Sequence, residues 1–162
     1  MSRSTASPSS ATSPAPTPAP AALAAVVGDR LGSFERVTDM GTWNRFAAVN
    51  DEFVGIHMED EAGRAAGYEG AIGMGNLQWA YVHNLLRAWI GEEGRIRSVS
   101  FELRGANVKG QRVLARGEVV ERTERDGEVV LSVNVWTSSG TGDQLGRGTA
   151  VVSLPSSPAR LG

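Results

Sequence analysis

Hydrophobic residues follow two different periods along this 162-residue chain. Between about residues 42 and 89, apolar positions recur every three to four residues, as they do on one face of a helix. After Gly94 they alternate with polar positions, which is the period of a strand with one buried face. The pattern therefore predicts a helical first half, a β-rich second half and an α+β fold.

Three helices are predicted in the first half. Residues 42–49, "TWNRFAAV", place their large apolar side chains on one face behind a threonine cap. Residues 59–67, "EDEAGRAAG", begin with acidic residues and end at a glycine. The strongest helix is "GNLQWAYVHNLLRAWIG", residues 75–91, which is apolar around most of its circumference. Such a helix is expected to be buried on most sides.

The second half predicts an antiparallel sheet. Alternating patterns indicate strands at residues 98–104, 112–123, 128–137 and 147–154. Asp126-Gly127 is a hairpin signal between the second and third of them, and a further strand is expected near residues 32–38. We expect a curved sheet packed on the long helix. Its edges could be covered by pairing across a dimer.

The two ends of the chain differ in composition from the middle. Residues 1–27 are rich in Ser, Pro and Ala and are predicted to be disordered, and residues 156–162 are predicted to be a flexible tail. The prolines in residues 1–27 argue against a secretory signal, and no uninterrupted apolar stretch approaches the ~18 residues of a membrane span. Residues 28–155 are therefore expected to form a single domain.

Charge and cysteine content narrow the possible functions. The net charge of −2, with 16 basic and 18 acidic residues, gives no reason to expect binding to nucleic acid or an anionic membrane. The chain has no cysteine, which excludes disulfides, thiolate metal sites and cysteine nucleophiles. This composition is consistent with the cytoplasm.

Two stretches carry candidate chemistry. Asp51, Glu52 and His57 lie in a loop between two predicted helices, where a carboxylate and an imidazole could share a water and divide proton transfer between them. The glycine-rich turn "AIGMGNL" directly precedes the long helix. A ligand can approach glycine closely, and the helix N-terminus there offers N–H groups that could stabilise an enolate-like oxygen.

Each candidate also has a structural interpretation. His57 could be a hydrogen-bonded loop residue, and His83, within the long helix, is expected to pack in the core or at an interface. The acidic residues 59–61 are expected to cap a helix, and no metal site is predicted. "GMGNLQ" and "GTGDQLG" lack the full glycine pattern and strand–helix context of a dinucleotide fingerprint.

Residues 46–57, "FAAVNDEFVGIH", resemble the signature of the MaoC-like, (R)-specific enoyl-CoA hydratases and dehydratases. That signature, Phe-Ala-x-x-Ser-Gly-Asp-Phe-Asn-Pro-x-His, is followed in the family by an acidic helix, an Ile-Ala-His-Gly-Met turn and a long central helix. The same order of parts runs through residues 34–154. The resemblance implies the hotdog fold, in which an antiparallel sheet wraps a long helix.

The resemblance also implies roles for the loop residues. Matched without gaps, Glu52 stands at the family's catalytic aspartate, Asp51 at its glycine and His57 at its histidine. A one-residue shift would instead place Asp51 at the aspartate, so both acids remain candidates. The chain departs from the family at residues 54–55, which are Val-Gly in place of Asn-Pro.

The turn before the long helix has its own departures. Met74 stands where the family has histidine, Gly75 is retained, and Asn76 replaces a methionine. The resemblance implies that Gly75 binds the thioester oxygen through its N–H group. Met74 and Asn76 would line the substrate site, and Trp79 would lie beside the acyl chain.

The implied activity is the reversible addition of water to a 2-enoyl thioester. The substrate would be an acyl group on CoA or on a carrier protein, with no other cofactor. A homodimer, a higher hotdog oligomer or a hetero-oligomer with a second hotdog chain is implied. Two alternatives stay open: a hotdog acyl-CoA thioesterase, and a non-catalytic partner that completes the acyl pocket of a sister subunit.

Overall fold

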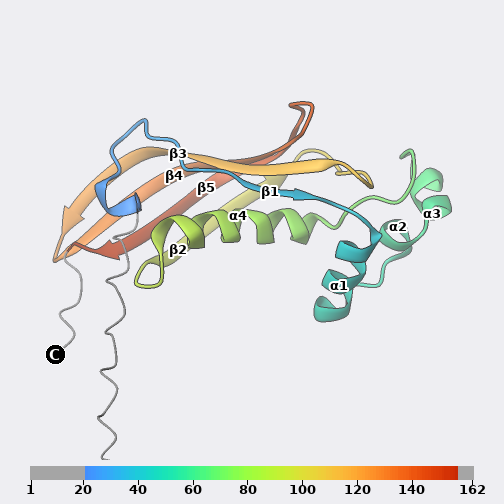
Figure 1. Ribbon diagram of the computed structural model, residues 1–162, viewed down its shortest axis with the longest axis horizontal. Coiled ribbons are helices and arrows are strands. Elements are labelled where there is room, and N and C mark those ends of the chain that lie inside the picture. The colour runs from blue at the N-terminus through green and yellow to red at the C-terminus, as the bar shows by residue number, and fades with distance from the viewer. Residues whose placement is uncertain (1–20, 157–162) are drawn as a thin grey trace, which may run out of the picture.

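The computed structural model describes residues 21–156 (Figure 1). The predictions for residues 1–20 and 157–162 lie outside the described residues. The helices are η1 (Ala21–Ala24, a 3-10 helix), α1 (Met40–Asn50), α2 (Gly55–Met58), α3 (Asp60–Ala65) and α4 (Gly75–Ile90). The strands are β1 (Phe34–Val37), β2 (Arg95–Leu103), β3 (Arg112–Arg125), β4 (Glu128–Ser139) and β5 (Gln144–Pro155). The predicted α+β division is confirmed.

The five strands form one antiparallel sheet in the order β1-β3-β4-β5-β2. The β3–β4 turn is Asp126-Gly127, whose φ angles of 54° and 78° match the left-handed conformation that a tight hairpin requires. All four predicted strands of the second half and the short strand near residues 32–38 are present. Alternation is clearest in β4, where buried positions take every second residue from Val129 to Thr137, and it explains why this strand could be found from sequence.

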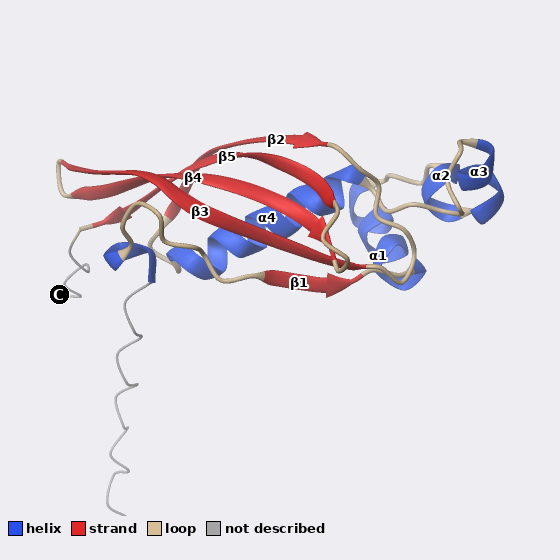
Figure 2. Cartoon of the chain, turned by 90° about the horizontal axis from the view of Figure 1, so that it is seen from above, coloured by secondary structure: helices blue, strands red, loops and turns tan. Residues whose placement is uncertain are grey.

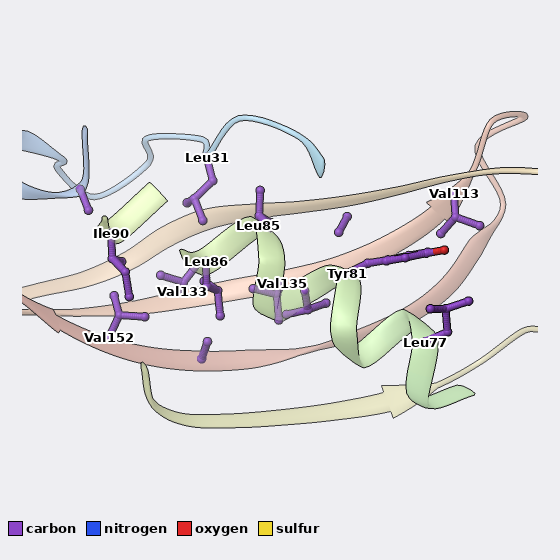
Figure 3. Packing of buried hydrophobic residues seen from close by; sticks show 14 of the residues in the cluster. Leu31, Leu77, Tyr81, Leu85, Leu86, Ile90, Val113, Val133, Val135 and Val152 are labelled. Carbon is purple, nitrogen blue, oxygen red and sulfur yellow. The ribbon is translucent and has the colours of Figure 1, made fainter. Parts of the chain in front are cut away.

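The sheet curls over one side of α4 (Figure 2). Buried side chains of α4 pack against inward-facing residues of the sheet, including Val113, Val133, Val135 and Val152 (Figure 3). The buried residues of α4 are Leu77, Gln78, Tyr81, Val82, Leu85, Leu86 and Ile90. This is the hotdog arrangement, and it confirms the prediction of a long helix wrapped by a curved sheet.

The start of α1 differs from the predicted threonine cap. Asp39 occupies the N-cap position, and its Oδ1 accepts a hydrogen bond from the Thr42 N–H at 2.7 Å. A carboxylate at the N-cap also interacts favourably with the positive end of the helix dipole, so it is the better cap. Thr42 therefore lies inside the helix.

The chain before β1 joins the fold earlier than the predicted boundary at Gly28. Ala22 and Ala25 are buried in the core, where small apolar side chains fit close to the sheet. The Gly28 N–H donates to the Val119 carbonyl at 2.9 Å, and the Val119 N–H donates to Asp29 O at 2.9 Å. The segment thus covers part of the β3 edge. The boundary was missed because hydrogen bonds between backbone groups require no particular pattern of side chains in the sequence.

The other end of the sheet is different. β2 pairs with β5 and, within residues 21–156, has no strand on its other side. Of the two edge strands, β2 with nine residues is longer than β1 with four, so β2 offers the longer edge for pairing with another chain. Within residues 21–156, no helix is both long enough and apolar enough to cross a membrane.

Candidate active site

The helices α1, α2 and α3 and the first turn of α4 gather at one end of the molecule, away from η1 (Figure 1). The loop between α1 and α2 contains the predicted acids, but His57 lies in the helix α2 and not in the loop where it was predicted. A helix of four residues is too short to show a helical period in the sequence. The strap that joins α3 to α4, residues 66–74, returns along this cluster. The fold therefore brings the two stretches with candidate chemistry into one region.

The end of α1 separates the two candidate acids. Asp51 is the C-cap residue, with φ 53° and ψ 40°, and its N–H donates to the Ala47 carbonyl. This left-handed conformation favours glycine, although aspartate tolerates it. Asp51 is exposed, and no hydrogen bond from the described part of the chain reaches its carboxylate. Its position is explained by helix termination.

Glu52 is turned toward α4. Its side chain is partly buried, and its Oε2 accepts a hydrogen bond from Asn76 Nδ2 at 3.4 Å. Asn76 lies in the first turn of α4, next to Gly75. Of the two acids, Glu52 is thus the one that contacts the start of the long helix.

His57 is held by the strap. Its Nδ1 lies 2.8 Å from the carbonyl oxygen of Ile72, and the Ile72 N–H in turn donates to Ile56 O at 3.1 Å. Because a carbonyl oxygen can only accept, Nδ1 must carry a proton and donate it. In the neutral ring Nε2 is then the unprotonated nitrogen. The structure therefore presents the tautomer in which Nε2 can accept a proton.

The start of α4 is closely packed. Its N-cap residue, Met74, is fully buried and makes no side-chain capping bond, so side-chain capping does not occupy the first N–H groups of the helix. A Cβ atom on Gly75 would lie 2.2 Å from Leu103 Cδ1. Leu103, at the end of β2, therefore lies directly against Gly75.

A pocket of about 280 Å³ lies between these elements. Its volume is close to the lower end of the range for small-molecule sites. It is lined by His57, Tyr68, Ile72, Gly73, Gly75, Gln78 and residues 103–106. The structure thus brings His57 and Gly75 to one cavity, while Glu52 and Asn76 meet beside it. Met74, Asp51 and Trp79 do not line it.

Gln78 is a site residue that was not predicted from sequence. It is 1% exposed, its Nε2 donates to Gly105 O at 3.1 Å, and its Oε1 accepts from Thr137 Oγ1 at 2.6 Å. It therefore fixes the loop that forms one wall of the pocket. A polar residue on the apolar face of the long helix was the signal that could have revealed it. Tyr68 and Arg104, on irregular segments, carried no such signal.

Trp79 lies outside the pocket. Its ring stacks on His83 at 5.8 Å between centroids, and His83 Nδ1 lies 3.0 Å from Trp79 O in the preceding turn. Both side chains are partly buried. The prediction that His83 has a packing role agrees with this geometry.

A larger hollow of about 460 Å³ lies on the sheet. Its wall includes Asn134 and Trp136, which alternate along β4 with core residues, so it is on the face away from α4. Its charged side chains, Glu102 and Arg147, lie within 4.0 Å of each other, and it contains no histidine. The smaller pocket is therefore the better candidate for acid–base chemistry.

The charged residues do not form a metal centre. Across residues 21–156, no group of three or more His, Cys, Asp or Glu side chains is arranged to hold a metal ion. Asp60, which contacts the strap, is instead bound to Lys109 and to the Ala71 N–H group.

Comparison with known proteins was made on sequence and on structure. No protein-family model matches the sequence, and the search of curated proteins finds no significant match. The (R)-hydratase from A. caviae involved in PHA biosynthesis superposes with a TM-score of 0.74 and 21% identity, covering 82% of this chain and 98% of that one.

Two further structures are similar to a comparable degree. The MaoC-like dehydratase from Rhodospirillum rubrum has a TM-score of 0.70 and 21% identity over 83% of this chain and 95% of that one. A chain of the ChsH1-ChsH2 complex from Mycobacterium tuberculosis has a TM-score of 0.70 and 21% identity over 80% and 98%. The chain therefore has the hotdog fold, the architecture of these (R)-hydratase and MaoC-like dehydratase structures.

Proposed function

We propose that this protein is a MaoC-like hydratase that reversibly adds water to a 2-enoyl thioester. The observation that carries the proposal is His57, whose Nδ1 is held by Ile72 O while the ring borders a pocket at the start of α4. The hotdog fold that the chain shares with an (R)-hydratase supports the same reaction class.

In the proposed reaction, Glu52 and His57 hold one water at the pocket. Hydration forms a bond between the water oxygen and C3 of the enoyl group and breaks the C2=C3 double bond, while the water gives up one proton and C2 gains one. Nε2 of His57 and the Glu52 carboxylate would divide these two proton movements. The reverse reaction removes the C2 proton and returns the C3 hydroxyl as water.

The start of α4 would stabilise the negative charge that develops on the thioester oxygen. Met74 leaves the first turn of α4 without a side-chain cap, so the Gly75 N–H would point its dipole at that oxygen. The substrate would be carried by CoA or by a carrier protein. Arginines such as Arg104, at the rim of the pocket, suit the phosphates of either carrier.

The two histidines of the chain provide a matched test. With purified protein and short or branched 2-enoyl-CoAs, hydration should remove the absorbance of the conjugated thioester. His57→Ala should lower kcat by about 10²–10⁴-fold, because it removes an acid–base group. His83→Ala, which removes the other ring bonded to a backbone carbonyl, should stay within about 3-fold of wild type because it lies outside the pocket.

Equal activity in wild type and His57→Ala would sink this assignment. Release of free thiol from a saturated acyl-CoA would instead identify a thioesterase, since hydration releases no thiol. That reaction would use a carboxylate and a water to attack the carbonyl.

A second candidate is a partner subunit in a hetero-oligomer. Beside the site loop, Val49, Phe53 and Val54 are exposed, with Phe53 63% accessible. An apolar patch of this kind suits contact with another protein chain. Inactivity of the isolated protein, followed by activity when a second hotdog chain co-purifies, would support this candidate over the first. In either case we expect a cytoplasmic assembly of at least two chains.

A further inference from the structure

We propose that Asp60 and Lys109 are positioning residues that fix the orientation of His57 by clamping the strap between α3 and α4. This inference rests on the proposed function for its catalytic consequence. Its structural content concerns the His57 ring itself and can be tested without any activity.

The clamp begins at an ion pair. Lys109 Nζ donates to Asp60 Oδ2 at 2.9 Å and to Oδ1 at 3.1 Å. The same Oδ1 accepts a hydrogen bond from the Ala71 N–H at 3.1 Å. The hydrogen bond from Lys109 is the main reason that the pKa of Asp60 lies below its ordinary value, so the carboxylate stays ionised at neutral pH.

The ion pair is connected to His57 through the strap, because Ala71 is followed directly by the residue that contacts the His57 ring. The next residue, Ile72, accepts a hydrogen bond from the His57 Nδ1–H group through its carbonyl oxygen at 2.8 Å. On the other side of the strap, Ile72 forms a β-bridge with Val108, and the Gly73 N–H donates to Asn107 O at 2.8 Å. Lys109 follows these two residues directly, so one short segment holds the strap by backbone and side chain.

The packing of α3 shows that the strap is held closely. A Cβ atom on Gly63 would lie 2.0 Å from the Gly70 carbonyl oxygen, and one on Gly70 would lie 3.0 Å from Asp60 Oδ1. The Asp60 and Lys109 side chains are 38% and 46% exposed. An ion pair this exposed contributes little to the stability of the fold. Its effect is to place one backbone carbonyl.

The chemical consequence is a fixed tautomer. Only with Ile72 O within hydrogen-bond distance of Nδ1 is the proton kept there and Nε2 left free to act as a base. If the strap shifts, the neutral ring should exchange between its two tautomers. In an active hydratase, the same shift should lower kcat more than it raises KM, because a small displacement of the His57 ring slows proton transfer more than it weakens substrate binding.

The experiment is a long-range ¹H–¹⁵N spectrum of the full chain, which has two histidines, so His83 is an internal control. Spectra would be recorded at about pH 8, above the ordinary titration range of histidine. In wild type, His57 should show a protonated Nδ1 and an unprotonated Nε2. In Asp60→Leu the two nitrogen signals should move toward each other, with His83 unchanged. Asp60→Asn, which keeps an acceptor for Ala71, should move them less.

Lys109→Met tests the ion pair in a variant that should fold. If Asp60→Leu does not fold, Lys109→Met provides the test of the inference. It should shift the His57 signals in the same direction. Glu61→Gln, an exposed change on the same helix, should shift nothing. Unchanged His57 signals in the folded Asp60 and Lys109 variants would overturn the inference, and a shift in the Asp60 variants alone would overturn the role of Lys109. Absence of hydratase activity would reject the proposed function but leave this comparison valid.

Discussion

At the scale of single residues, the two neighbouring acids have different tasks. Asp51 ends α1 in a left-handed conformation and is exposed, whereas Glu52 meets Asn76 at the start of α4. The gap-free match to the MaoC-like signature also sets Asp51 at a glycine. The φ of 53° supplies a physical reason for that match, because glycine adopts this region without strain.

Paired substitutions should separate the acids. Asp51→Gly should change the free energy of unfolding by less than about 1 kcal/mol and hydration activity by less than about 3-fold, because glycine suits the backbone there. Glu52→Gln keeps the size of the side chain but removes the proposed base, and under the proposed function it should lower kcat by about 10²-fold or more. The checks are urea unfolding and enoyl-CoA hydration assays. The opposite ranking of the two variants would make Asp51 the partner of His57.

At the scale of elements, glycines decide how closely helices and strands approach. A Cβ atom on Gly148 in β5 would lie 1.9 Å from the carbonyl oxygen of Ser100 in β2. The atom it would meet belongs to the backbone and cannot move without separating the strands. At Gly75 the nearest atom is the end of the Leu103 side chain, which can rotate away.

Gly148→Ala should therefore lower the free energy of unfolding by about 2–3 kcal/mol, as overpacking does in other cores. The control is Gly32→Ala, where the added Cβ meets no atom within 4 Å and the effect should stay within about 0.5 kcal/mol. Denaturant titrations followed by circular dichroism would measure both variants. Equal stabilities would mean that β2 and β5 can separate without cost.

At the scale of the whole molecule, three carboxylates link the stability of the fold to pH. Hydrogen bonds lower the pKa of Asp39 through the Thr42 backbone, of Asp60 through Lys109, and of Asp143 through Thr141. In the unfolded chain these groups take up protons near their ordinary value of 3.8. The unfolded state therefore binds protons at a higher pH than the folded state.

Their contribution to stability is complete above the ordinary pKa and is lost as the pH falls through the lowered values. We expect these groups to change the melting temperature little between about pH 7 and pH 5. Below about pH 4, their protonation should lower it. Thermal melts of wild type and Asp143→Asn would test this, and the variant should show the shallower fall. A melting temperature that stays constant down to about pH 3 would contradict the assignment of these lowered pKa values.

The amino-acid sequence determined the regular elements. Alternation after Gly94 predicted the strands, and the apolar circumference of residues 75–91 predicted the buried helix. Both could be predicted because burial of one face of a regular element places apolar residues at regular intervals in the sequence. The resemblance to the MaoC-like signature added the expected fold, which the structure confirms. It also named His57 and Gly75, which the structure brings to one pocket.

The tertiary structure alone decided what holds these residues in place. The bond from His57 to Ile72, the Lys109–Asp60 pair and the contacts of Gln78 join residues 15 to 59 positions apart in the chain. The Asp39 cap is local, spanning three residues, but only the backbone geometry chose it over Thr42. The pairing of residues 28–31 with β3, like the contacts of His57, Lys109 and Gln78, joins groups far apart in the chain. Such long-range contacts impose no period on the sequence, because each is a single contact between groups that come together only in the folded domain.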